Sequence, residues 1–214
     1  LLFHTDAVQA FGKVPMNLDD IQVDFLSISA HKLYGPKGTG ALFMRAGNSL
    51  SPLIYGGGQE YNLRASTENI AGIGGFGMAT ELSINNLEKN VEYIKLLETH
   101  FIKQLHEKEI SFNINGTNRL PGVFNLTFHD IKGQDLVIQL DMLGIAISFG
   151  AACASGTAKA SSMLMDMGVS ESDSLSTVRI SFGKIHSYQD IEKVVDAIYE
   201  SIINQKYNTM THEG

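Results

Sequence analysis

The sequence predicts a mixed fold, α/β or α+β, rather than an all-helical or all-strand one. Two runs in the second half alternate apolar and polar side chains with the period of two that a half-buried strand requires. Other runs place apolar side chains three and four residues apart, which is the spacing of an amphipathic helix. Because such strands and helices alternate along the 214 residues, we expect sheets that pack against helices.

The opening third of the chain contains three runs that predict strands. Leu1–Phe3 is an apolar run typical of a buried strand that is already under way. Residues 24–30 (DFLSISA) and 40–45 (GALFMR) are short apolar runs bounded by turn residues. Residues 34–38 (YGPKG) between them cannot continue a helix or a ladder, so we expect a hairpin-like or crossover pair.

The most regular helical pattern follows a glycine loop at residues 56–58. Apolar side chains recur with a period of 3.6 between Leu87 and Leu105, which predicts a helix. We expect the long helix that starts near residue 80 to separate two lobes. Residues 73–77 (IGGFG), just upstream, contain too many glycines for propensity to predict a helix, although packing can still impose one.

The second half alternates strands with a short helix. Residues 124–128 and 178–182 each have the period of two that predicts a half-buried strand. Between them, the apolar side chains of residues 136–143 form a helical stripe that stops at Gly144.

A final helix follows the last predicted strand. It should begin at Ser187, because Asp190 three residues later completes a capping box. The tail, residues 204–214, continues no apolar stripe, and we expect it to fray.

Composition excludes several classes of protein. The single cysteine rules out an intrachain disulfide framework and a zinc site built from paired cysteines. A net charge of -7 has the wrong sign for binding nucleic acid. The sequence has no run of 18 apolar residues and no secretory signal, so we expect no membrane span and a cytoplasmic location. The seven histidines show no metal-ligand spacing, and we expect no metal.

Polar side chains follow two of the predicted strands. Lys32, next to His31, places an amine at a strand end, where α/β folds collect ligand contacts, although most lysines are solvated surface charges. Asp6 and Gln9 follow the opening strand. A carboxylate at this point can hold a protonated ring nitrogen, or it can cap a helix that begins at Ala7.

Cys153 and Arg179 are the other candidates for chemistry. Cys153 lies in a run of small residues, 148–156, that would leave its sulfur accessible, and an inert cysteine is an equally open interpretation. Arg179 alternates with Val178 and Ile180, so it should point away from the face that they bury. Its guanidinium is then either solvated or available to bind a carboxylate.

Together these runs resemble the cysteine desulfurases, the NifS-like pyridoxal-phosphate enzymes of the class V aminotransferase superfamily. The resemblance covers nearly the whole chain and corresponds to the C-terminal portion of the family only. It is carried by HTDAVQAFGKVP, SAHKLYGPKGTGALF, GGGQE, RASTEN, SFGAACASG and TVRISFG. Several motifs in this order are far more specific than any one of them.

The resemblance implies a site for pyridoxal 5'-phosphate in the first half of the chain. Lys32 matches the lysine that binds the cofactor covalently through its aldehyde, and Asp6 matches the acid that keeps the pyridine nitrogen protonated. Gln9 matches the residue that hydrogen-bonds the ring oxygen. Ser29 and His31 match ligands of the cofactor phosphate.

The resemblance implies roles for three further residues. Thr67 matches a threonine that reaches the phosphate of the neighbouring subunit in a homodimer. Arg179 matches the arginine that binds the substrate carboxylate. Cys153 matches the nucleophile that takes sulfur from L-cysteine as a persulfide and leaves L-alanine. A persulfide needs a sulfur-acceptor protein, which in the family is an iron–sulfur scaffold or a thiolation enzyme.

The family's fold implies two parts. Residues 1–84 correspond to the C-terminal part of the cofactor-binding large domain of a fold type I transferase. Residues 85–214 correspond to a smaller α+β C-terminal domain that carries the cysteine loop. The family's upstream half is absent, so we expect this chain alone to hold the cofactor poorly and to be weakly active or inactive. Two local departures are Ser66, where the family has glycine in R-x-G-T, and residues 157–160, where Glu-Pro is common.

Two alternatives stay open. A related class V enzyme, such as a selenocysteine lyase or an aminotransferase, would need Lys32 and Asp6 but would not depend on Cys153. A non-catalytic remnant or dimerisation lobe would need none of them. The sequence favours the desulfurase, because a small-residue loop around the sole cysteine has no role in transamination.

Overall fold

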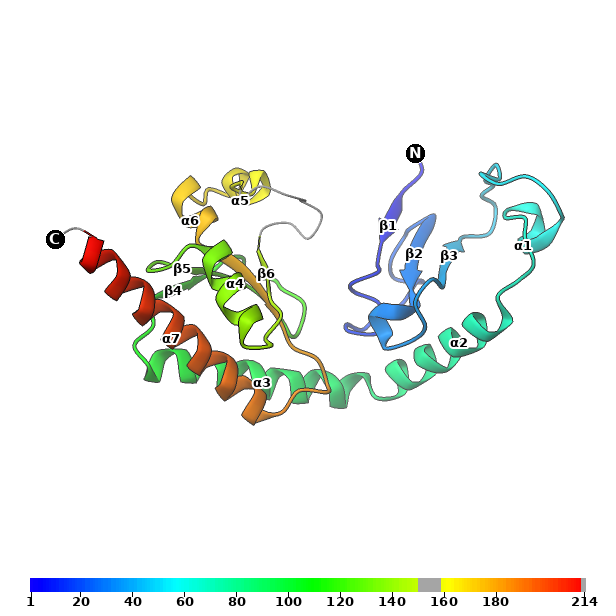
Figure 1. Cartoon of the computed structure of the whole chain (residues 1–214). Coiled ribbons are helices and arrows are strands. Elements are labelled where there is room, and N and C mark those ends of the chain that lie inside the picture. Colours follow the sequence, from blue (N-terminus) through cyan, green and yellow to red (C-terminus); the bar gives the residue numbers. More distant parts are fainter. Residues whose placement is uncertain (150–158, 213–214) are drawn as a thin grey trace. The chain divides into compact units, whose positions relative to one another are not determined.

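The computed structural model describes residues 1–149 and 159–212. The chain divides into two compact units, Leu1–Val91 and Glu92–Gly214, which we describe separately (Figure 1). Both units combine strands with helices, so the predicted mixed class is confirmed.

The first unit is built on a three-stranded sheet. Its elements are β1 (His4–Asp6), β2 (Phe25–Ser29), the 3-10 helix η1 (Ala30–Leu33), β3 (Gly40–Met44), α1 (Gln59–Asn62), α2 (Ile70–Asn85) and the start of α3 (Leu87–Glu107). The strand order is β1-β2-β3. β1 runs parallel to β2, and β2 and β3 form an antiparallel pair across the turn that the sequence predicted.

The expectation of a buried strand at Leu1–Phe3 is wrong. The strand begins at His4, and all three opening side chains are exposed. Only the backbone of Phe3 is held, because its N–H donates to Asp24 Oδ2 (2.8 Å) and its carbonyl accepts from the N–H of Asp24 (2.9 Å). The apolar run alone therefore did not predict where the strand begins.

The glycine-rich stretch at residues 73–77 is helical and belongs to α2. Asn69 caps the helix, since its Oδ1 accepts from the N–H of Gly72 (3.0 Å). Phe76 and Ala79 pack on η1 in a small apolar cluster. A Cβ atom at Gly72 would lie 2.5 Å from Thr39 Oγ1. Glycine at this position therefore lets α2 pack closely against Thr39, and this packing outweighs the low helix propensity of glycine.

The second unit is built on a four-stranded antiparallel sheet in the order β4-β5-β7-β6. Its elements after α3 are β4 (Phe112–Ile114), β5 (Val123–Phe128), α4 (Gly133–Met142), β6 (Ser148–Phe149), α5 (Ser162–Asp166), α6 (Glu171–Leu175), β7 (Thr177–Ser181) and α7 (Tyr188–His212). The strands and the helix that the sequence predicted here are confirmed, including the stop at Gly144, which has φ of 76°.

One face of this sheet forms the larger core. Phe124 on β5 and Val178 on β7 are fully buried, together with Phe101 from α3 and Ile198 from α7. The opposite face is polar, because residues two apart on a strand share a face. That polar face presents Asn125, Thr127, Thr177, Arg179 and Ser148.

The final helix has the predicted start but a different end. Ser187 and Asp190 make the capping box, with the Ser187 N–H donating to Asp190 Oδ2 (2.8 Å) and the Asp190 N–H donating to Ser187 Oγ (3.3 Å). The expectation that the tail frays from residue 204 is wrong, since α7 continues to His212. Gln205 Nε2 donates to Asp135 Oδ2 (3.2 Å) on α4, and this tertiary contact anchors α7 at residue 205, just past its apolar stripe.

Candidate functional site

The two parallel strands of the first unit end at one edge of their sheet. Asp6 is the last residue of β1 and lies opposite Ser27 in register, while Ser29 ends β2 two residues further on. The carboxyl ends of parallel strands are where open α/β sheets bind ligands. The structure thus brings Asp6 and Ser29 to the same sheet edge, whereas the sequence alone predicted only that Asp6 and Lys32 each lie at a strand end.

The carboxylate of Asp6 also organises the chain that follows it. Asp6 Oδ1 accepts from the N–H of Val8 (2.9 Å), and residues 7–13 form turns rather than a regular helix. Gln9 lies in these turns and accepts from Lys13 Nζ through Oε1 (3.1 Å). Asp6 therefore makes the backbone hydrogen bond that the capping interpretation predicted, but no regular helix follows it. This contact uses only one of the two carboxylate oxygens.

The 3-10 helix η1 carries the predicted lysine. Ser29 Oγ lies 2.7 Å from His31 Nδ1, so a hydroxyl and an imidazole are joined directly before Lys32. Tyr34 ends η1 in the left-handed region with φ of 63°, which turns the chain back toward β3. Lys32 is half-buried, and within the described part of the chain its amine makes no hydrogen bond or ion pair.

A polar cavity of about 240 Å³ surrounds Thr67. Its lining comes from Glu60, Arg64, residues 66–69, Ile73 in the first turn of α2 and residues 38–40. Thr39 connects the cavity to the strand edge, because its carbonyl accepts from the N–H of Ala30 (3.0 Å) and from Ser29 Oγ (3.5 Å). The Thr39 hydroxyl is buried without a hydrogen-bond partner among the described residues. The sequence carries no signal for this feature, because a threonine before a strand is common.

The second unit holds Arg179 on the polar face of its sheet. The side chain is half-buried, and Nη2 donates to Ser148 Oγ at 3.2 Å. The expected orientation, away from the core that Val178 and Ile180 form, is confirmed. The contact with Ser148 was not predicted, since it depends on strand pairing that sequence periodicity does not specify.

Cys153 lies outside the described residues, so its role rests on the sequence.

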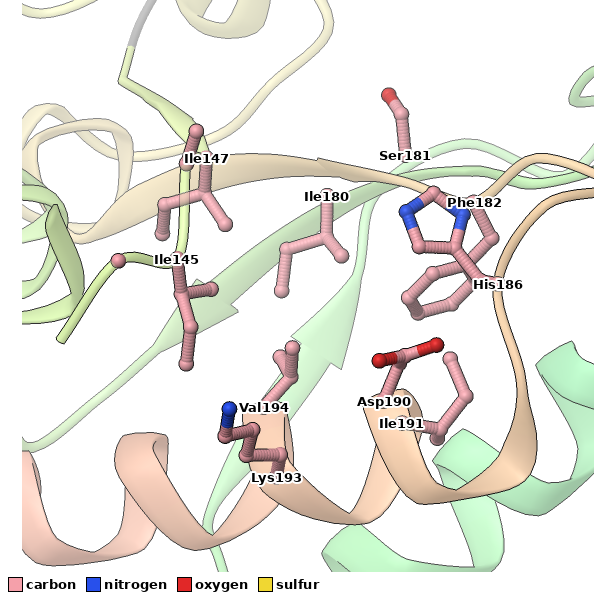
Figure 2. Close-up of a pocket in the computed structure, with 12 residues that line it drawn as sticks. Ile145, Ile147, Ile180, Ser181, Phe182, His186, Asp190, Ile191, Lys193 and Val194 are labelled. Carbon is pink, nitrogen blue, oxygen red and sulfur yellow. The ribbon is translucent and has the colours of Figure 1, made fainter.

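A second cavity, of about 290 Å³, lies in the same unit but contains no predicted site residue. Figure 2 shows its walls, which come from the segment before β6, the end of β7 and the first turns of α7. Asp190 is one of the lining residues, and hydrogen bonds from the backbone N–H and the hydroxyl of Ser187 lower the pKa of its carboxyl. The lining of this cavity mixes apolar side chains with polar ones such as His186 and Lys193, and it does not include Arg179.

Two further observations concern metals and membranes. Within residues 1–149 and 159–212, no group of three or more His, Cys, Asp or Glu side chains could hold a metal ion. Among the helices that the structure describes, none combines the length and the apolar character needed to cross a bilayer.

The sequence matches the aminotransferase class-V family model over residues 1–194. The chain belongs to this family. It is 41% identical to cysteine desulfurase IscS of Dictyoglomus turgidum over 96% of this chain and 52% of that protein. A solved NifS-like protein from Rickettsia africae superposes with a TM-score of 0.82 at 35% identity, over 94% of this chain and 53% of that one. SspA in complex with cysteine superposes with a TM-score of 0.65 at 35% identity, over 87% of this chain and 52% of that one.

The chain thus spans about half the length of the curated relatives that it matches. Their family depends on pyridoxal 5'-phosphate, and the chemistry of the donor set at the sheet edge fits that group. Lys32 offers an amine for the aldehyde, Asp6 a carboxylate for the ring nitrogen, and the Ser29–His31 pair hydrogen-bond donors for the phosphate. These residues would hold the cofactor.

Proposed function

We propose that the complete protein is a cysteine desulfurase that releases sulfur from L-cysteine as a persulfide on Cys153 and yields L-alanine. The observation that carries the proposal is the arrangement at the edge of the first sheet. Lys32 follows the Ser29–His31 pair directly, and Asp6 ends the neighbouring parallel strand. Similarity to the desulfurase of Dictyoglomus turgidum, and to SspA in complex with cysteine, supports the choice of L-cysteine as substrate.

The residues at the sheet edge have distinct tasks. Pyridoxal 5'-phosphate, when bound, supplies an electron-withdrawing ring that stabilises negative charge at the substrate Cα. Asp6 keeps a proton on the ring nitrogen through its carboxylate, which preserves that withdrawing power. Lys32 Nζ would hold the cofactor through its aldehyde, and the lysine amine would act as the base that accepts the proton from the substrate Cα.

Two residues act on the substrate itself. Arg179 binds the α-carboxylate through its guanidinium, whose planar donors match the two carboxylate oxygens. Cys153 Sγ attacks the substrate sulfur, so that a new S–S bond forms while the substrate Cβ–S bond breaks and its electron pair stays with the carbon fragment. Protonation of that fragment at Cβ, and return of the proton from Lys32 to Cα, would give L-alanine.

The proposal extends to partners and location. A homodimer would let Thr67 contact the phosphate held by the partner subunit, and the exposed position of Thr67 in a polar cavity supports this. The persulfide would pass to an acceptor protein, either an iron–sulfur scaffold or a thiolation enzyme. A nucleophilic thiol needs a reducing compartment, which supports the cytoplasm. Because this chain spans about half of its relatives, we expect it to show little activity alone.

The test uses the complete protein that contains this chain, with alanine and sulfide measured after addition of L-cysteine and a thiol reductant. We expect Lys32→Ala and Cys153→Ala to abolish turnover. Lys37→Ala is the matched control, because Lys37 is exposed in the turn that follows η1 and should leave turnover unchanged.

The outcomes separate the alternatives. Full sulfur release by Cys153→Ala would overturn the proposal in favour of another class V enzyme. A wild-type protein in which borohydride fixes no pyridoxyl group on Lys32 would overturn it in favour of a non-catalytic role.

A further inference from the structure

Arg179 has a polar neighbour on each side in its sheet. β7 lies between β5 and β6, and the register places Arg179 opposite Asn125 on β5 and opposite Ser148 on β6. Residues that lie directly opposite each other on antiparallel strands point to the same face, with Cβ atoms about 4.5–5.5 Å apart. The three side chains therefore form one row across the polar face of the second unit.

Ser148 holds one end of the guanidinium. Arg179 Nη2 donates to Ser148 Oγ at 3.2 Å, and Arg179 makes no other hydrogen bond or ion pair to a described residue. A guanidinium is planar and carries five N–H donors, so a hydrogen bond at one nitrogen restricts the orientation of the whole group. The remaining donors are left for a bidentate contact with a carboxylate.

Asn125 lies close to the other side of Arg179. The N–H of Phe182 donates to the carbonyl of Gly122 (2.6 Å), which makes Gly122 and Phe182 a hydrogen-bonded pair. Pairs alternate along antiparallel strands, so Asn125 and Arg179 form a non-hydrogen-bonded pair, the type with Cα atoms about 4.5 Å apart. Their side chains are consequently near neighbours.

The amide of Asn125 is oriented by a second asparagine. Asn115 Nδ2 donates to Asn125 Oδ1 (2.8 Å) and to Thr127 Oγ1 (2.9 Å). The Asn125 carbonyl is thereby used, and its NH₂ group keeps two donors that no described residue accepts. An amide held in this way can donate to an anion that Arg179 binds.

We propose that Ser148, Arg179 and Asn125 form one carboxylate-binding row, in which Ser148 positions the guanidinium and Asn125 donates to the same carboxylate. The inference rests on the proposed function, which makes that group the α-carboxylate of L-cysteine. It predicts that the affinity for amino-acid substrates depends on three residues from three strands.

The kinetic test uses the complete protein with L-cysteine. Loss of one hydrogen bond to a charged group weakens binding by about 1.5–3 kcal/mol, or roughly 10- to 100-fold. We expect Ser148→Ala and Asn125→Ala each to raise KM by roughly tenfold or more while kcat changes by less than about threefold. Ser148→Thr keeps the hydroxyl and should retain a KM near that of the wild type. Ser181→Ala is the matched control, because Ser181 is exposed two residues along the same face of β7 and should leave KM unchanged.

A spectroscopic test uses this 214-residue chain and needs no turnover. In ¹⁵N relaxation measurements on the Arg179 Nε–H group, identified by its loss in Arg179→Lys, we expect Ser148→Ala to lower the order parameter. Ser148→Thr and Ser181→Ala should leave it at the wild-type value. A role of Ser148 in folding alone would change the melting temperature without changing this signal selectively.

The two tests distinguish this inference from the proposed function. An inactive complete wild-type protein would overturn the proposed function, while the relaxation data would still decide whether Ser148 orders Arg179. If the complete protein is active and its Ser148→Ala and Asn125→Ala variants keep the wild-type KM, the inference is overturned. The proposed desulfurase function is then unaffected. Unchanged mobility of Arg179 in Ser148→Ala would also overturn it.

Discussion

Replacing Glu98 with alanine should destabilise the second unit by about 2–4 kcal/mol. Glu98 lies on α3 and is 8% exposed. Its carboxylate accepts from Arg119 in an ion pair and from the backbone N–H of Gly122 at 2.6 Å. Gly122 immediately precedes β5 and pairs with Phe182 after β7, so the contact fixes the end of the two central strands.

The magnitude follows from the two partners. Leaving the buried N–H of Gly122 unpaired costs about 1–3 kcal/mol. The side chain of Arg119 is 31% exposed and can regain water, so loss of the ion pair adds only about 1 kcal/mol. Glu92→Ala is the matched control, since Glu92 is exposed on the same helix and its removal should change stability by less than about 0.5 kcal/mol.

Two measurements check this prediction. Urea unfolding followed by circular dichroism gives the free energy of unfolding of each variant. Hydrogen exchange of the Gly122 amide gives a local measure, which should accelerate in Glu98→Ala and not in Glu92→Ala. A Glu98→Ala protein that unfolds within about 0.5 kcal/mol of the wild type, with Gly122 still protected, would refute the reasoning.

Three other changes test the fold that positions the site. Phe101→Ala should cost about 3–5 kcal/mol in urea unfolding, because Phe101 is fully buried against two other aromatic rings, and a loss below about 1 kcal/mol would contradict that packing. Gly133→Ala should cost about 1–3 kcal/mol, since its Cβ would lie 2.7 Å from the carbonyl oxygen of Thr177, and an unchanged unfolding midpoint would contradict that contact. Asp190 has a lowered pKa, so its carboxylate stabilises the fold at neutral pH and this contribution is lost as the pH falls below about 3.8. The stability difference between wild type and Asp190→Asn should therefore shrink on acidification, and a difference that grows would be inconsistent with the capping hydrogen bonds.

Regular periodicity predicted the long elements well. The helix from Leu87, the strands around Phe124 and Val178, and the capping box at Ser187 are all confirmed, because each buries a stripe or satisfies a cap within its own sequence. The extent of α7 could not be predicted in the same way, since the contact of Gln205 with Asp135 on α4 depends on tertiary structure.

Elements that depend on distant partners were missed. β4 and β6 are three and two residues long and exist as strands only because β5 and β7 pair with them. In α2, Gly72 and Gly75 let the helix approach Thr39 and Pro36 closely, a tertiary relation that local helix propensity does not contain.

The candidate site shows the same division. Motif order identified Lys32, Asp6 and Arg179, while the pairing of Ser29 with His31 required the turn into η1. The neighbours of Arg179 required strand register, so Ser148 could be identified only from the structure.

The central claim is that Lys32 holds the cofactor while Cys153 takes the sulfur, and peptide mass spectrometry of the complete protein tests both parts at once. The protein is mixed with pyridoxal 5'-phosphate and L-cysteine, and then divided between borohydride reduction for the Lys32 peptide and thiol alkylation for the Cys153 peptide. We expect a phosphopyridoxyl group on Lys32 and one additional sulfur atom on Cys153. Release of alanine with Lys32 unmodified after reduction, or with Cys153 never carrying extra sulfur, would contradict the account.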